Sequence, residues 1–147
     1  MKKDVFLSRE DEDISRCFDW KEDMRCGDPD IDADHQHIFE LAQHLRSVSI
    51  RGRERIVVGK ALIDLMDYAH SHFQREEALM QSSAYPMLEE HRMEHAALLE
   101  LIHELHRDFM DGKAIGRADV WRLLSRWVQH HVLSTDRALV LFVRQSR

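Results

Sequence analysis

Apolar residues recur at helical spacing in four segments of this chain, and this repeat limits the fold more than any other feature. In each segment they return every three or four positions, as along the buried face of an α-helix. The four faces start near Ile38, Ile56, Leu88 and Val120. Only five Gly and two Pro interrupt the 147 residues, which leaves few turns for short strands. The sequence therefore predicts an all-α fold.

Three short connections separate these segments. The stretch 51–53 divides the first from the second, and the stretch 111–116, with two glycines, divides the third from the fourth. Between them, Pro86 ends the second segment because proline disfavours the α conformation in the residue before it. Short connections make consecutive helices antiparallel neighbours, so we expect an up-down-up-down antiparallel four-helix bundle. Asp32 is the predicted N-cap of its first helix.

The beginning of the chain, up to about residue 31, shows no sustained helical repeat. We expect residues 1–19 to be an N-terminal extension and residues 20–147 to be the bundle domain. Phe18, Trp20 and Met24 are apolar enough to pack as an ordered arm. Trp20 either covers the functional site or only anchors this arm. The length suits one domain of ordinary size, and the sequence shows no internal repeat.

The charge pattern argues against a nucleic-acid or membrane partner. The formal net charge is −6, and no basic block exceeds a few residues. The longest apolar run, 138–143, is far too short to span a bilayer. The first residues lack the apolar core of a secretory signal. We therefore expect a cytoplasmic protein, in whose reducing surroundings Cys17 and Cys26 remain thiols.

Histidine is the residue type that stands out, with eleven copies. His72 lies four residues before Glu76 in the second segment, and the third segment contains His91 and His95 at the same spacing. Residues four apart lie on one face of a helix, one turn from each other. Every segment supplies at least one candidate metal ligand. The full set is His35, His72, Glu76, His91, His95, His131 and Asp136.

The chemistry of this set favours two transition-metal ions. Imidazole together with carboxylate suits iron, manganese or zinc better than magnesium or calcium, which prefer oxygen ligands. Five imidazoles and two carboxylates exceed the needs of one tetrahedral zinc. They suit two octahedral ions that share bridging carboxylates, and helix-bundle cores hold such centres. The alternative is surface charge pairing, as between His72 and Glu76, but it would have to hold in four places at once.

The spacing of His131 and Asp136 does not fit an ideal helix. Five residues turn an α-helix by about 500°, which leaves these side chains about 140° apart. Both can reach one metal pair if the helix is locally widened, for example by a π-type turn. Otherwise Asp136 must reach around the helix. The sequence leaves both alternatives open.

Four ordered motifs resemble those of the hemerythrin family, and of the bacteriohemerythrins in particular. The first is Ile31-Asp32-x-x-His35-x-x-Ile38-Phe39, and the second is His72-Phe73-x-x-Glu76-Glu77-x-x-Met80. The third is His91-x-x-x-His95, and the fourth is Trp127-x-x-x-His131-x-x-x-x-Asp136. The resemblance covers about residues 20–140. One His-x-x-x-His motif alone is a weak signal, whereas four motifs in order supply every candidate ligand.

The resemblance implies a bundle that holds two iron ions (Fe2+/Fe3+) joined by an oxo or hydroxo bridge. It implies three histidines on one iron, two on the other, and two carboxylates that bridge them. The second iron would keep an open position for dioxygen. The three sets are, respectively, His91, His95 and His131; His35 and His72; and Glu76 and Asp136.

The resemblance also implies an apolar pocket that keeps water away from the open position. Its lining would be Ile38, Phe73, Trp127 and Val128. The family usually has leucine where this chain has Val128, and glutamine is common where it has Asp34. Asp28 stands where an aliphatic residue is common. A smaller pocket residue and nearby carboxylates would speed ligand access or autoxidation.

These features favour an oxygen-binding protein, for carriage, storage or delivery of dioxygen, over an enzyme. The same centre could instead act as a ferroxidase, a peroxidase or a nitric-oxide-handling enzyme. Oxygen or redox sensing through a protein partner is a third alternative, although nothing in the sequence identifies a partner. The remaining histidines have no motif role, and we expect surface or ordinary polar positions for them. They are His37, His44, His70, His103, His106 and His130.

Overall fold

The computed structural model describes residues 22, 25, 27–47 and 52–146, without the side chains of residues 128 and 129. The predicted N-terminal extension, Trp20 and both cysteines lie outside them. The division of the chain at residues 19 and 20 therefore stays a prediction.

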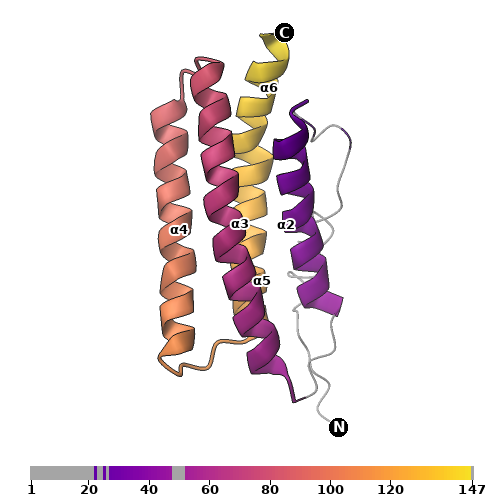
Figure 1. Cartoon of the computed structure of the whole chain (residues 1–147), viewed down its shortest axis with the longest axis vertical. Helices are drawn as coiled ribbons and strands as arrows, with labels where there is room; N and C mark the ends of the chain where they lie inside the picture. Colours follow the sequence, from indigo (N-terminus) through magenta and orange to yellow (C-terminus); the bar gives the residue numbers. More distant parts are fainter. Residues whose placement is uncertain (1–21, 23–24, 26, 48–51, 147) are drawn as a thin grey trace.

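Four helical rods run antiparallel to one another (Figure 1). α2 spans Pro29–Ser47, α3 spans Glu54–Ser82 and α4 spans Leu88–Met110. The fourth rod consists of α5 (Arg117–Trp127), the π-helical segment η3 (Val128–Asp136) and α6 (Arg137–Gln145). In Figure 1, α2 and α4 descend while α3 and the fourth rod ascend. The predicted all-α, up-down-up-down bundle is confirmed, and the part of the chain that is described contains no strand.

The first helix begins earlier than predicted, and a different aspartate caps it. The carboxylate of Asp28 accepts hydrogen bonds from the backbone N–H groups of Asp30 (3.0 Å) and Ile31 (3.1 Å). This is N-cap geometry, and Pro29 then occupies the first helical position, where no N–H is needed. Asp32 instead accepts from the backbone N–H of Gly27 at 3.3 Å. The prediction of Asp32 as N-cap was wrong, because the preceding Asp-Pro pair is the stronger start signal.

The apolar faces of the helices meet in a large core and in a smaller one beyond the predicted ligands. The large core includes Leu45 of α2, Leu62 of α3 and Ile102 of α4, each fully buried. Burying one such side chain contributes about 1.5–3 kcal/mol. The smaller core joins Met80 of α3 to Leu139 of α6. Along α3 and the fourth rod, the predicted ligands fall where the large core gives way to the small one.

Three residues that the helical spacing placed on apolar faces lie at the surface instead. Ile56 of α3 and Met93 of α4 are each 71% exposed, and Leu101 of α4 is 48% exposed. Ile56 lies in the first turn of α3, at the end of the bundle. Met93 lies midway between His91 and His95, and two residues turn a helix by about 200°. It therefore points away from the side of α4 that carries these histidines.

Candidate metal centre

All seven predicted ligands are buried and come together inside the bundle, with exposed fractions of 2% or less. They form two overlapping groups, and the candidate ligand atoms of each group lie within 4.8 Å of one another. One group has three histidines and the other has two, and both contain the same two carboxylates. The groups are His91, His95 and His131 with Glu76 and Asp136, and His35 and His72 with Glu76 and Asp136. We call the seven residues the histidine–carboxylate cluster.

Glu76 places one carboxylate oxygen against each group. Its Oε1 lies 2.5 Å from His91 Nε2 and 3.3 Å from His95 Nε2. Its Oε2 lies 2.9 Å from His72 Nε2 and 3.5 Å from His35 Nε2. Because the two oxygens face different histidine groups, this carboxylate is placed to bridge two ions.

Asp136 makes a similar arrangement from the fourth rod. Its Oδ1 lies 2.9 Å from His91 Nε2 and 3.0 Å from His131 Nε2, and its Oδ2 lies 3.1 Å from His35 Nε2. The segment η3 is π-helical, so its turns close over five residues rather than four. This brings His131 and Asp136 to one face of the rod. Of the two alternatives left open by the sequence, the widened helix is the one observed.

Several of the converging atoms are buried without a hydrogen-bond partner. They are Nε2 of His35, His72 and His91, Oε2 of Glu76 and both carboxylate oxygens of Asp136. An unpaired buried polar atom costs about 1–3 kcal/mol, and such atoms are rare in native structures. Here nitrogens and oxygens approach one another without forming hydrogen bonds, as ligand atoms directed at a common ion do. The cluster therefore fits a metal centre.

Three further carboxylates contact the opposite ring nitrogens of three of the histidines. A hydrogen bond at Nδ1 fixes the orientation of an imidazole, so that Nε2 faces the centre. The pairs are Asp34 with His72 (3.2 Å), Glu77 with His95 (3.2 Å) and Glu94 with His131 (2.9 Å). The helical spacing of the sequence did not predict these supports. One signal was present, because each of them directly adjoins a predicted ligand in the sequence.

Asp34 has the most contacts of these three supports. It accepts a hydrogen bond from Arg75 Nε at 2.7 Å, and its other oxygen pairs with the same guanidinium. Burial alone would raise the pKa of Asp34, but His72 and Arg75 lower it below its usual value. The Tyr68 hydroxyl donates to the Asp34 backbone carbonyl, and the Tyr68 ring stacks on His72 with centroids 5.5 Å apart. Tyr68 thus supports His72 from a second side, which the sequence did not predict.

Three of the four predicted pocket residues are buried near the histidines. Phe73 stacks on His95 with ring centroids 3.9 Å apart. The ring centroids of Trp127 and Phe73 are 5.3 Å apart. Ile38 is 1% exposed and belongs to the same core as these aromatic residues. The side chain of Val128 lies outside the described part of the chain. Its place in the pocket stays a prediction.

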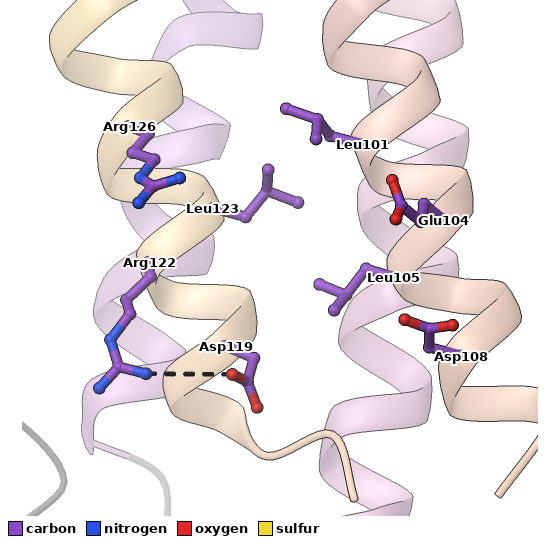
Figure 2. A pocket seen from close by; sticks show the side chains of 8 residues that line it. All are labelled: Leu101, Glu104, Leu105, Asp108, Asp119, Arg122, Leu123 and Arg126. Carbon is purple, nitrogen blue, oxygen red and sulfur yellow. Dashed lines mark ion pairs between the residues drawn. The ribbon is translucent and has the colours of Figure 1, made fainter. Parts of the chain in front are cut away.

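Two surface hollows lie between α4 and the fourth rod, and both are lined by Leu101 and Leu123. Figure 2 shows the first, of about 310 Å³, in which Leu101 and Leu105 of α4 face Leu123 of α5. The second, of about 260 Å³, extends to Trp127 and His131. A largely apolar recess therefore connects the surface with the edge of the histidine–carboxylate cluster.

In the metal-free protein, the histidines and carboxylates of the cluster shift one another's pKa values. Burial alone would lower the pKa of three histidines, but Asp136 and Glu76 raise it to about 10 for His35, about 9 for His91 and about 11 for His131. Burial likewise opposes the charged carboxylates, yet the surrounding histidines hold the pKa values of Glu76 and Asp136 below their usual range. Protons on the histidines therefore compensate for the buried carboxylates.

Residues 26–142 match the family described as the Hemerythrin HHE cation binding domain. The chain belongs to the hemerythrin family. It is 32% identical over 127 residues to a bacteriohemerythrin of Pseudomonas aeruginosa, a match that covers 86% of this chain and 82% of that protein. A bacteriohemerythrin of Stenotrophomonas maltophilia is 32% identical over 119 residues, or 81% and 76% of the two chains. One of Methylococcus capsulatus is 31% identical over 106 residues, or 72% and 80%.

Membership of the hemerythrin family agrees with the buried histidine–carboxylate cluster, which is able to hold a metal. The six histidines without a motif role lie outside the cluster, at exposed or half-buried positions, as predicted. None of the described helices has both the length and the apolar character that crossing a membrane requires.

The metal-free protein should lose stability as the pH rises from 6.5 towards about 10. The pKa values of His35, His91 and His131 are raised above their ordinary value of 6.5, so the folded state binds more protons than the unfolded state over this range. Urea unfolding of chelator-treated protein at several pH values measures the effect. Metal-saturated protein is the control, because its ligating imidazoles are already neutral and should show no such loss. A metal-free protein that became more stable towards pH 10 would contradict the charge state described here.

Proposed function

We propose that this chain binds dioxygen reversibly at a di-iron centre formed by the histidine–carboxylate cluster. The observation that carries the proposal is the placement of Glu76 and Asp136 between a three-histidine and a two-histidine group. Each carboxylate directs its two oxygens to different groups. One buried site with shared anions suits two closely spaced cations, because the anions offset the repulsion between them. A single tetrahedral ion would leave several of these ligands unused.

The unequal histidine groups support an open coordination position at one ion. In the proposed assignment, His91, His95 and His131 would hold one iron, and His35 and His72 would hold the other. Glu76 and Asp136 would be shared by the two ions, together with an oxo or hydroxo group from solvent. The first ion would then have six ligands and the second five, so an octahedral second ion would keep one position free. Bound iron would supply the open coordination position and the electrons for a reversible transfer to dioxygen.

The chain's own residues would protect this exchange from water. Phe73 and Trp127 are almost fully buried and lie against each other beside the histidines. The recess between α4 and the fourth rod reaches Trp127, and Leu98 and Leu123 also line it. Glu94, Arg126 and His130 also border the recess, but most of its exposed lining is apolar, so a small apolar gas can approach Trp127 along the leucines. Excluding protons and water favours release of intact dioxygen over its further reduction.

Oxygen binding should be visible in the absorption spectrum of iron-loaded protein. The protein is reduced without oxygen, exposed to air and then returned to an oxygen-free atmosphere. We expect a coloured form in air that bleaches when oxygen is removed, over repeated cycles. Immediate and irreversible conversion to the ferric state, with hydrogen peroxide released or consumed, would reject reversible binding. That outcome would favour a ferroxidase or peroxidase activity of the same centre.

Removing either bridging carboxylate should lower the iron content. Glu76→Ala and Asp136→Ala each delete a ligand shared by both ions, so we expect about one iron per chain or fewer, measured by elemental analysis after purification. Glu76→Gln keeps the volume and one oxygen, and separates ligand loss from misfolding, which circular dichroism monitors. The control is His44→Ala, at an exposed position outside the cluster. If both alanine variants retain two irons, the ligand assignment is wrong.

Asp34 should act as a positioning residue for the two-histidine ion. Asp34→Ala removes the contact at His72 Nδ1, and loss of such a support lowers metal affinity by about ten- to a hundredfold. Asp34→Asn keeps an oxygen acceptor for the imidazole N–H, so it should restore much of the affinity. Iron retention against a graded series of chelator concentrations measures both. Glu40→Ala, an exposed change on the same helix, is the control. Equal retention in the wild type and Asp34→Ala would contradict this role.

A further inference from the structure

Two histidines outside the histidine–carboxylate cluster lie together at the surface of the bundle. His70 of α3 is exposed and His103 of α4 is half-buried. Their Nε2 atoms are 3.3 Å apart, with ring centroids 5.5 Å apart and an angle of 58° between the ring planes. Neither residue belongs to a family motif, and neither contributes to the metal centre described above.

The nitrogen separation and ring angle of this pair are similar to those of two histidines in the buried centre. His95 and His131, proposed above to hold one iron, have Nε2 atoms 3.2 Å apart and ring planes at 55°, with their ring centroids closer together at 4.9 Å. In both pairs the two imidazoles come from different helices and direct the same nitrogen at each other. The surface pair therefore has the arrangement of two ligands that share an ion.

The separation of the nitrogens is the one that a tetrahedral ion held between them would require. Two imidazole nitrogens, each about 2.0–2.1 Å from a tetrahedral zinc ion, lie about 3.3–3.4 Å apart. The observed 3.3 Å between the two Nε2 atoms of His70 and His103 falls in this range, and it is also within hydrogen-bonding distance. Neutral imidazole is also a preferred ligand of zinc.

We propose that His70 and His103 form a second metal site, which binds a zinc-class divalent cation and links α3 to α4. Among the described residues, no third histidine, cysteine or carboxylate joins the pair closely enough to complete a protein-only ligand set. Water fills the remaining positions, so the site is open and exchanges its ion readily. It is chemically distinct from the buried centre, since it has no bridging carboxylate and lies at the surface.

The test is a titration of iron-loaded protein with Zn2+ against a chromophoric zinc chelator. The wild type should bind one zinc that both His70→Ala and His103→Ala weaken by about a hundredfold, because the second imidazole acts as an intramolecular ligand. The double variant should lose no more than either single variant. His44→Ala, which removes an exposed histidine outside the pair, should bind zinc as the wild type does. Zinc should also raise the thermal unfolding midpoint of the wild type, and not that of the single variants.

The wild type and the His70 and His103 variants have the same buried centre, so any zinc bound there contributes equally to all of them. The difference in zinc affinity between them therefore reports the surface site. Iron content and circular dichroism confirm that His70→Ala, two residues from His72, leaves the bundle intact. His103→Ala provides the same test far from any proposed ligand in the sequence. Equal zinc affinity in the wild type and both single variants would overturn the proposal and leave the pair as a hydrogen bond. Small losses that add up in the double variant would also overturn it.

Discussion

Two buried carboxylates, Glu76 and Asp136, set conditions that the rest of the structure must meet. Both are 1% exposed or less, and a buried carboxylate costs several kcal/mol unless nearby cations compensate for it. The compensating imidazoles come from all four rods, so each helix must present its histidine at the same level and on the inner face. The apolar cores on either side of the cluster fix that level. Protonated histidines meet this charge requirement in the metal-free protein, and the proposed metal pair would meet it in their place.

The three supporting carboxylates, Asp34, Glu77 and Glu94, link each helix of the bundle to the next. Asp34 of α2 contacts a histidine of α3, Glu77 of α3 contacts one of α4, and Glu94 of α4 contacts one of the fourth rod. Each support therefore adjoins a predicted ligand in its own helix and orients a ligand in the next. A small rotation of one helix would disturb its own ligand and that of its neighbour. The predicted ligands are held by contacts between helices as well as by the core.

The sequence predicted the helices and the clustered residues because both follow from local spacing. Pairs four residues apart, such as His72 and Glu76, share a helix face whatever the tertiary structure. The role of Asp34 could not be read in this way, since its partner His72 is distant in sequence and is chosen by helix packing. The cap at Asp28 was not predicted, although the Asp-Pro pair that indicates it is a local signal. The predicted start of the helix was placed at Asp32 because the apolar repeat begins after that residue. Iron and dioxygen rest on family resemblance, since the ligand types alone also suit manganese.

The five-residue interval between His131 and Asp136 explains why an uncommon helix type persists in the fourth rod. π-Helical turns are rare and are frequently found at functional sites. If η3 rewound as an α-helix, Asp136 would turn about 140° away from His131, and its oxygens would leave the histidine groups. The following helix, α6, would rotate as well and draw Leu139 and Val143 away from Met80. The convergence of the predicted ligands and the packing of α6 therefore both require the wide turn, so the histidine–carboxylate cluster depends on the backbone of this helix as much as on its side chains.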